Sequence, residues 1–330
     1  MTLLALLDEG AGFDAEYAAD LSNHRPMALL ALARLGASDA RLTAFAAAYS
    51  RRLRPAPAPE AWPRGDAWPP RLGERAAWPA YRDLFAEWLH HEAADDVLNA
   101  VLPRLMAGCG AAAFHGLIRT AYAVQAGQRQ ELADALAYWA CRWQVLFPEA
   151  GAGTAVPAAA PAPACERDPA AVLRGLPVPS TPPAGRLISQ RMETVAAQPG
   201  FAAALARLDV DARTPERLAR GAAELYAASG NFTVLHMLTS AHALRVLLPF
   251  VDEPLAAVQH YWQAFATAWA ASGARDRGVA PLRPWPQIVA FAIASDDDHV
   301  AKLVDSCREQ ERAYGGAVWR RAASRVLQAA

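Results

Sequence analysis

Four histidines of this chain lie where an imidazole could do chemistry. Each is at the start of, or inside, an apolar segment with helical spacing: His24, His115, His236 and His299. One buried histidine is usually a core residue bonded to a carbonyl group, but burying several polar rings without partners is costly. Imidazoles that converge from several helices form sites suited to iron, zinc or copper. The pattern therefore indicates a metal site.

The other four histidines fit such a site less well. His236 and His242 are six residues apart, roughly 240° around a helix, so one helix cannot readily aim both at one ion. We rank His236 first because its neighbours are apolar, and we leave His242 outside the site. His90, His91 and His260 are typical of a solvated helix face.

Lys302 is the only lysine in the chain, although Lys and Arg together number 32. Its amine can lose a proton when it is desolvated, whereas a guanidinium stays charged. It lies three residues after His299, on the same helix face, in what we expect to be the first turn of a helix capped by Ser295 or an aspartate. The positive end of that helix favours an anion.

Three explanations of Lys302 stay open. Biased codon usage accounts for a lone lysine without any function. The spacing favours an ion pair with the aspartates at 296–298, in a cluster at the protein surface. Alternatively, the amine takes up carbon dioxide and becomes an anionic carbamate that binds a cation.

The elements that must position these residues are predicted to be helices. Ala- and Leu-rich segments with helical spacing dominate, and alternating β-branched runs are almost absent, so we predict an all-α fold without a sheet. Gly36 and Gly127 are typical of residues that end helices. The predicted helices are 27–35, 114–126, 131–146, 186–198, 215–229, 232–248, 255–272, 285–294, 299–313 and 318–327.

Two proline-rich segments interrupt these helices. Residues 54–70 carry repeated Trp-Pro pairs, and residues 151–184 are rich in alanine and proline. Proline removes an amide donor and disfavours helix in the residue before it, so we expect a loop at 54–70 and a loop or flexible segment at 151–184. Because candidate histidines lie on both sides of the second segment, we predict one helical domain over residues 1–330.

Composition excludes several classes of protein. The net charge is −1 and there is no basic run, which argues against nucleic-acid and anionic-membrane partners. The four cysteines are scattered, which excludes a cysteine-built metal site and is typical of a reducing compartment. Charged and polar residues interrupt the long apolar stretches, so we expect no transmembrane helix. These features predict a soluble cytoplasmic protein.

Four motifs together resemble the questin oxidase-like family. They are SNHRPMAL at 22–29, FHGLIR at 114–119, LHMLTS at 235–240 and DHVAK at 298–302, and the aromatic segment 68–89 adds to them. The matches follow in order along nearly the whole chain. The resemblance implies an all-helical oxygenase that oxidises a polycyclic aromatic substrate of the anthraquinone type and opens a ring, by a Baeyer–Villiger-type or other ring-cleaving reaction.

The resemblance also implies a non-haem Fe(II) centre that uses dioxygen. Carried over by motif, its ligands would be His24, His115, His236, His299 and a Lys302 carboxylated by carbon dioxide. The candidate catalytic residues lie on motif helices: Arg119 and Arg245, which would orient a phenolate or pair with nearby acids, and Thr239, three residues after His236. Candidate cavity-lining tryptophans, which would otherwise fill the core, are Trp62, Trp68, Trp78 and Trp285.

Two other functions stay open at this stage. A hydrolase or lyase would use zinc in the same histidine set, and oxygen consumption with an aromatic substrate would separate it from an oxygenase. A non-catalytic helical protein that binds an apolar ligand predicts histidines that lie far apart. No glycine-rich dinucleotide motif supports a bound nicotinamide or flavin, which leaves an external reductant such as NADPH open.

Overall fold

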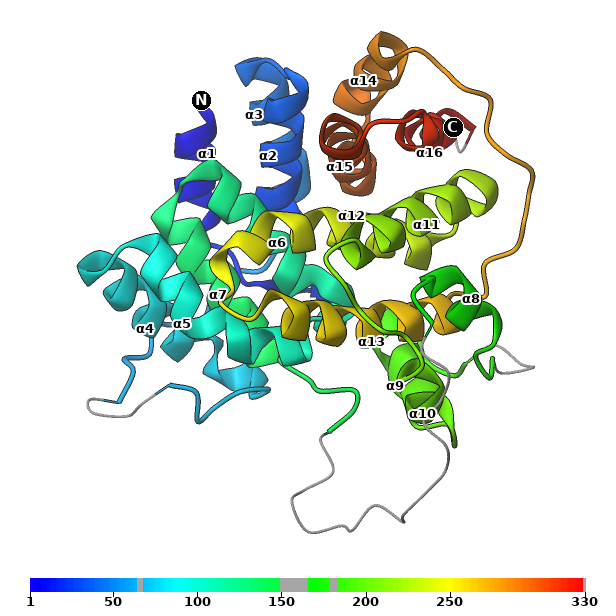
Figure 1. The fold of residues 1–330 in the computed structure, drawn as a ribbon. Helices are drawn as coiled ribbons and strands as arrows, with labels where there is room; N and C mark the ends of the chain where they lie inside the picture. Colours follow the sequence, from blue (N-terminus) through cyan, green and yellow to red (C-terminus); the bar gives the residue numbers. More distant parts are fainter. Residues whose placement is uncertain (64–67, 149–165, 179–182, 329–330) are drawn as a thin grey trace.

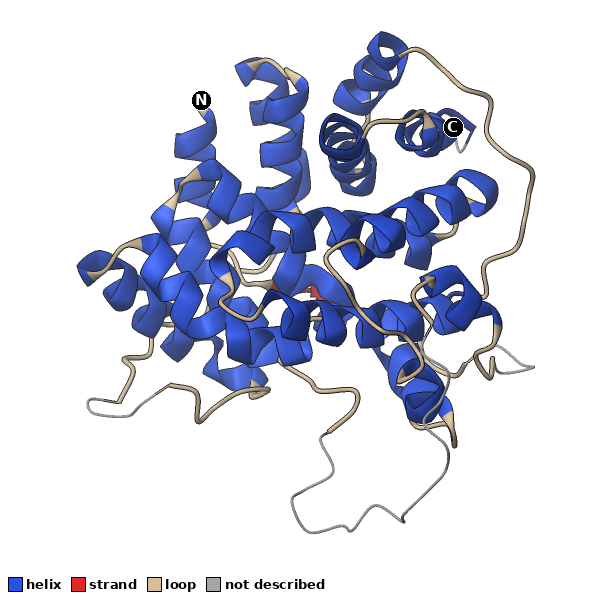
Figure 2. Cartoon of the chain, viewed as in Figure 1, coloured by secondary structure: helices blue, strands red, loops and turns tan. Residues whose placement is uncertain are grey.

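The computed structural model describes residues 1–63, 68–148, 166–178 and 183–328, and in this part the chain is almost entirely helical, as predicted (Figures 1 and 2). The first half contains α1 (Leu3–Gly10), α2 (Arg25–Leu35), α3 (Asp39–Ser50), α4 (Trp78–His91), α5 (Ala94–Leu105), α6 (His115–Ala126) and α7 (Arg129–Arg142). The second half contains α8 (Pro169–Arg174), α9 (Ile188–Ala196), α10 (Phe201–Leu205), α11 (Thr214–Ser229), α12 (Phe232–Leu247), α13 (Pro254–Ser272), α14 (Trp285–Ala294), α15 (Asp298–Tyr314) and α16 (Val318–Ser324). Short 3-10 turns cover Arg75–Ala77, Met106–Gly108, Ala111–Phe114, Leu248–Phe250 and Arg325–Gln328.

The expectation of no sheet was wrong at one place. Glu16–Tyr17 (β1) pairs antiparallel with Leu21–Ser22 (β2), and the pair lies among the helices in Figure 2. Ala18 and Asp20 adopt φ values of 47° and 68° to make the turn between them. Strands of two residues are too short to leave an alternating pattern in the sequence. Strand β2 leads directly into α2 and so fixes the place where that helix begins.

The predicted helix ends at glycines are confirmed. Helix α2 stops at Gly36, whose φ is 96°, and α6 stops at Gly127, whose φ is 63°. Such left-handed backbone favours glycine because it lacks a Cβ atom. Helix α7 ends four residues earlier than predicted, because Trp143 turns to an extended ψ of 131°.

The two proline-rich segments differ from each other. The described residues of 54–70 form no helix, as expected, while 64–67 lie outside the described residues. The prediction of an irregular 151–184 was wrong for Pro169–Arg174, which forms α8. The Asp168 carboxylate accepts a hydrogen bond from the Ala170 amide, and proline at the first helical position needs no amide donor. Residues 151–165 and 179–182 lie outside the described part.

Helix α12 lies at the centre of the fold, where it contacts α6, α11, α13 and α15 (Figure 1). Every residue from 233 to 244 is buried, so His236 and His242 are both inside the protein although they face different ways. Helix α15 also packs against α2. Helices from before and after the segment 151–184 therefore share one core. Within the described residues, no helix has the length and apolar character needed to cross a membrane.

Gly116 allows α6 to approach α7 closely, and replacing it should destabilise the fold. A Cβ atom on Gly116 would lie 2.9 Å from the Cα atom of Trp139 and 2.6 Å from its Cγ atom. Because a backbone atom cannot move aside cheaply, we expect Gly116→Ala to lower the free energy of unfolding by about 1–3 kcal/mol. Urea denaturation measures this change.

The matched control is Gly221→Ala in α11. Apart from its chain neighbours and the backbone of its own helix, no described atom lies within 4 Å of a Cβ on Gly221, and the residue is exposed. Alanine is the better helix former, so this variant should gain up to about 1 kcal/mol. Equal urea midpoints for the two variants would contradict the close approach of α6 and α7.

Candidate metal centre

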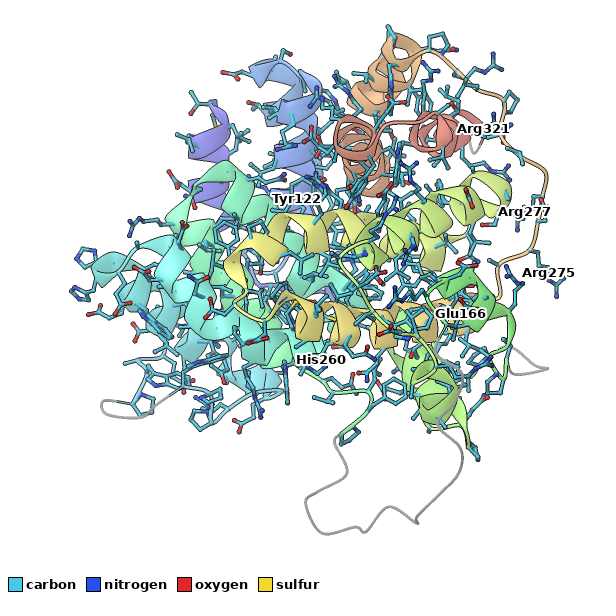
Figure 3. The ribbon with its side chains drawn as sticks, viewed as in Figure 1. Tyr122, Glu166, His260, Arg275, Arg277 and Arg321 are labelled. Atoms are coloured by element: carbon cyan, nitrogen blue, oxygen red, sulfur yellow. The ribbon has the colours of Figure 1, made fainter. Side chains whose placement is uncertain are left out.

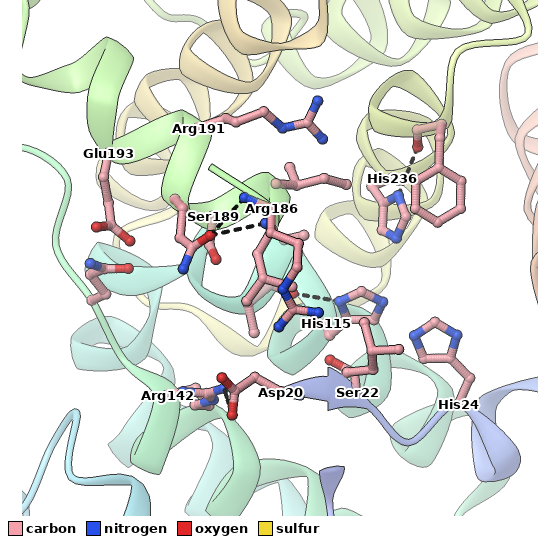
Figure 4. A pocket seen from close by; sticks show the side chains of 18 of the residues that line it. Asp20, Ser22, His24, His115, Arg142, Arg186, Ser189, Arg191, Glu193 and His236 are labelled. Carbon is pink, nitrogen blue, oxygen red and sulfur yellow. Dashed lines mark hydrogen bonds and ion pairs between the residues drawn. The ribbon is translucent and has the colours of Figure 1, made fainter. Parts of the chain in front are cut away.

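Four predicted ligands converge on one cavity: His24, His115, His236 and His299. The ring centroids of His24 and His115 are 4.5 Å apart, and those of His24 and His299 are 4.7 Å apart. The ring of His236 closes the set, at 4.9 Å from His115 and 5.5 Å from His299. Figure 4 shows three of these rings along one side of the cavity. The hypothesis of a non-catalytic protein that binds an apolar ligand predicted histidines far apart, and this convergence contradicts it.

Four helices position these rings. His24 immediately precedes α2, His115 is the first residue of α6, His236 lies in the second turn of α12, and His299 is the second residue of α15. The Asp297 carboxylate caps α15 by accepting a hydrogen bond from the His299 amide at 2.9 Å. The chain thus brings residues from both halves of the sequence to one point.

A left-handed turn precedes α6. Ala112, Ala113 and Phe114 have φ values of 46°, 56° and 67°, a region that residues with a Cβ atom rarely adopt. Each such residue costs roughly 1–3 kcal/mol, and the cost is offset where surrounding contacts determine the conformation. Here the Phe114 side chain is fully buried in the core. The turn directs the Ala112 carbonyl group to Nδ1 of His115, with which it makes a short hydrogen bond.

Each of the four rings uses its Nδ1 atom to contact an oxygen atom of the protein. The partners are Asp298 for His24, the Ala112 carbonyl for His115, the Phe232 carbonyl at 2.8 Å for His236, and Asp297 at 3.2 Å for His299. Metal-ligating histidines are usually held in this way, because the oxygen fixes the ring and leaves the other nitrogen for the metal.

The second nitrogen of these rings is available. The Nε2 atoms of His24, His115 and His299 are buried and have no hydrogen-bond partner among the described residues. Burial, followed by the positive charge of Lys302, lowers the pKa of His24 to about 3. Burial and the neighbouring imidazoles also hold the pKa values of His115 and His236 well below the usual range. The rings of His24, His115 and His236 are therefore neutral near pH 7 and carry the lone pair that a metal ion requires.

Asp298 supplies the negative charge beside these rings. Its Oδ2 atom makes a short contact with Nδ1 of His24 and lies 3.3 Å from Nδ1 of His299. Although burial alone would raise it, His24, Lys302 and His299 hold the pKa of Asp298 well below its usual range. Ligand atoms of Asp298, His24 and His299 all lie within 4.8 Å of one another. The donor set fits a divalent metal ion.

Lys302 lies beside this set rather than in the cavity lining. Its Nζ atom is 3.7 Å from Oδ2 of Asp298, and the side chain is 3% exposed. The ion pair expected from spacing is therefore present, but a surface cluster was wrong, because both partners are buried. Burial lowers the pKa of Lys302 to about 8, although Asp298 opposes the shift. With this pKa, a fraction of the Lys302 amines is neutral near pH 7.

The expected place of Lys302 in the first helical turn was also wrong. Helix α15 begins at Asp298, so Lys302 is its fifth residue. The helix dipole acts mainly within the first turn, and the electrostatic argument for an anion at Lys302 is correspondingly weaker.

Three further candidate residues lie apart from the histidines, and none is among the described residues that line the cavity. Arg119 is buried and forms two hydrogen bonds to Glu131, at 2.6 and 2.9 Å. Thr239 donates to the Leu235 carbonyl at 3.1 Å, in its own helix. Arg245 donates to Gln310 at 3.0 Å and contacts His242 at 3.3 Å. The structure thus gives Arg119 the acidic partner that the sequence left open.

The buried Arg119–Glu131 pair should be important for stability. In Glu131→Gln the Arg119 guanidinium would stay buried with only Asp134, at 3.9 Å, as an acidic partner. Leaving a buried charge unpaired costs about 3–5 kcal/mol, and we expect a loss of that size in urea denaturation. In the control variant Glu87→Gln, which removes an exposed pair with His91, the loss should stay below about 1 kcal/mol. Equal losses would show that burial of the first pair is unimportant.

The remaining histidines follow their expected places in part. His242 is 1% exposed and contacts Arg245, outside the cavity. His91 is exposed and pairs with Glu87 at 2.9 Å, in agreement with a solvated face, and His90 is exposed beside it. His260 on α13 is partly buried rather than fully solvated (Figure 3).

Two residues of the site were not singled out from the sequence. Asp298 belongs to the DHVAK motif, and a carboxylate immediately before a candidate ligand was a usable signal. Phe232 is 53% exposed, and its ring lies 4.7 Å from that of His236 and 4.8 Å from that of His299. No pattern in the sequence distinguishes Phe232 from a core residue at the start of α12.

The histidines line a cavity of about 570 Å³, which is within the range of small-molecule sites. Its other walls come from the β1–β2 hairpin, the left-handed turn, the end of α7 and the first half of α9. Trp143 is the lining tryptophan among the described residues. The candidates Trp62, Trp68, Trp78 and Trp285 do not line this cavity and instead pack in or against the core, the alternative that the sequence left open. Those four pack elsewhere, for example Trp62 on Tyr81 and Trp68 on Phe85.

Comparison with known proteins identifies a family that matches most of the chain. A family model described as Questin oxidase-like matches residues 21–307, which include the four histidines, Asp298 and Lys302. The chain belongs to the questin oxidase-like family. No curated protein matches the sequence. Membership of the questin oxidase-like family indicates an oxidoreductase that acts on a small molecule, and the matched residues 21–307 contain the whole histidine site.

Proposed function

We propose that this protein is a non-haem iron oxygenase that uses dioxygen to oxidise a polycyclic aromatic substrate of the anthraquinone type and open one of its rings. The observation that carries the proposal is the convergence of four imidazoles, each fixed through Nδ1, on a cavity of about 570 Å³. Imidazole ligands suit iron in an oxygenase, and the family is one of oxidases.

His24, His115, His236 and His299 would hold the iron through their free nitrogens. When bound, the iron supplies the redox chemistry by which dioxygen reacts with an electron-rich ring. The residues of the chain position the ligands and the substrate. The oxygen atoms on Nδ1 fix each ring, Asp298 balances positive charge, and Phe232 offers an aromatic face beside His236 and His299.

Lys302 would complete the ligand set as a carbamate. The ammonium group first loses a proton, and the neutral amine then adds to carbon dioxide and releases a second proton, so the side chain changes from cation to anion. Without a metal ion, Asp298 at 3.7 Å favours the ammonium form. A bound cation reverses that preference, so carbamate formation and metal binding should each promote the other.

Metal analysis tests the proposal. Protein purified without chelators should contain about one iron per chain and should consume oxygen when a reduced anthraquinone is added, with an external reductant such as NADPH if turnover requires one. Turnover of the quinol by metal-free protein would contradict an iron oxygenase. A zinc enzyme on the same histidines would consume no oxygen.

A further inference from the structure

One wall of the cavity carries two arginines that have no carboxylate partner among the described residues. Arg186 donates to the Ala19 carbonyl at 2.5 Å, and the Nε atom of Arg191 is buried without any hydrogen-bond partner. Both residues line the cavity, Arg191 on α9 and Arg186 just before it. In Figure 4, the Arg191 side chain extends from α9 towards the side of the cavity on which His236 lies.

The other charged groups of the lining do not neutralise these two. Arg142 is paired with Glu16 at 2.5 Å, and Asp20 is held by Arg75 and, at 3.9 Å, by Arg142. Glu193, on the same helix, also lines the cavity, but it forms no ion pair with Arg191 among the described residues, since residues two apart point to different sides of a helix. The α9 wall thus presents two arginines and one carboxylate, an excess of positive charge, to a cavity that has the four imidazoles on another side.

We propose that Arg191, assisted by Arg186, binds a negatively charged oxygen substituent of the substrate and so determines substrate specificity. A guanidinium group offers a fork of donors that matches a carboxylate or a phenolate oxygen. The aromatic part of the substrate lies against Phe232, whose exposed ring is next to His236 and His299. The aromatic character of the ligand rests on the proposed function, whereas the charge preference rests on the arginines alone.

Binding of two matched probes tests the proposal. Anthraquinone-2-carboxylate and the uncharged anthraquinone-2-carboxamide have nearly the same shape, and quenching of the fluorescence of Trp143 and other tryptophans reports their binding without turnover. The carboxylate should bind at least tenfold more tightly to the wild type. Arg191→Gln should weaken carboxylate binding on the order of tenfold, as expected for the loss of a charged hydrogen bond, and change carboxamide binding by less than about twofold. Arg186→Gln should act in the same direction but more weakly, because Arg186 is exposed.

Two control variants separate charge recognition from a general effect. Arg191→Lys keeps the charge but loses the fork and should retain part of the preference. Arg321→Gln removes an exposed arginine on α16, away from α9 (Figure 3), and should leave both probes unaffected. A third probe, 2-hydroxyanthraquinone, measured below and above its own phenol ionisation, shows whether a phenolate is bound as well as a carboxylate.

Equal affinity of the two probes for the wild type would overturn the proposal, as would equal weakening of both by Arg191→Gln or absence of binding at millimolar concentration. The result is independent of the iron proposal, because a variant that lacks a histidine ligand should keep the preference for the carboxylate. If the protein holds no iron but Arg191 still selects the anion, the oxygenase proposal fails and the anion site stands.

Discussion

Iron content should fall sharply in a His236→Ala variant and stay near the wild-type level in a His242→Ala variant. The two histidines lie on the same helix, both are buried, and they are 2% and 1% exposed. They differ in direction, since His236 lines the cavity beside His115 and His299, whereas His242 contacts Arg245. Loss of a residue that merely supports a ligand costs 10- to 100-fold in metal affinity, so loss of a ligand should cost on the order of 100-fold or more.

The pair of variants is matched for its effect on stability. Each removes one buried imidazole from α12 and leaves a hole of the same size, so the two should unfold at similar urea concentrations. Iron per chain is measured by mass spectrometry after purification without chelators, and oxygen uptake with a reduced anthraquinone is measured in parallel. Iron lost equally from both variants, or retained in both, would contradict His236 as a ligand.

Lys302→Arg should also lose iron, although it keeps the positive charge. A guanidinium cannot be carboxylated, and in place of an anionic ligand the site would hold a permanent cation about 4 Å from Asp298. Because the carbamate needs carbon dioxide, iron uptake by the metal-free wild type should be faster and more complete with bicarbonate. In Lys302→Arg, bicarbonate should have no effect. Full iron content in the variant would exclude Lys302 as a ligand.

A spectroscopic measurement identifies the modified amine directly. Wild-type protein loaded with diamagnetic Zn²⁺ in ¹³C-labelled bicarbonate should show a carbamate carbon signal that Lys302→Arg lacks. Lys302→Met has a similar length without charge and serves as a second control. Lys302→Met should also lack the signal. Because it buries no guanidinium, comparing the two variants distinguishes loss of the carbamate from the cost of burying that group. A signal present in all three proteins would come from another amine.

The all-helical fold was predictable because its signals are local. Helical spacing of apolar residues placed most helices, and glycines that adopt left-handed backbone ended α2 and α6. The family was predictable from four short motifs and is confirmed over residues 21–307. The β1–β2 pair, α8 and α10 were missed because each is too short to produce a periodic pattern. Helices α1, α3, α4 and α5 were also absent from the predicted helices, although they are longer.

The site was predictable only where a residue type carries chemistry by itself. Histidines and a lone lysine are conspicuous in an apolar sequence, and the structure places the four histidines together. Their assignment as iron ligands, and that of Lys302, stays a prediction. Arginines are not conspicuous, because the chain has many, and the sequence directed attention to Arg119 and Arg245 rather than to Arg186 and Arg191. Which arginine lacks an acid is a property of tertiary contacts, such as the Arg119–Glu131 pair.

The left-handed turn before α6 determines when the site acquires its shape. Because buried Phe114 anchors the turn, folding of the core already holds Ala112 and Ala113 in their costly conformation. The conformational cost of aligning His115 is therefore met during folding. Binding of a metal ion does not require this turn to become ordered. A receptor that is rigid before binding discriminates between ions by how well each fits its spacing, and not by how strongly each attracts nitrogen.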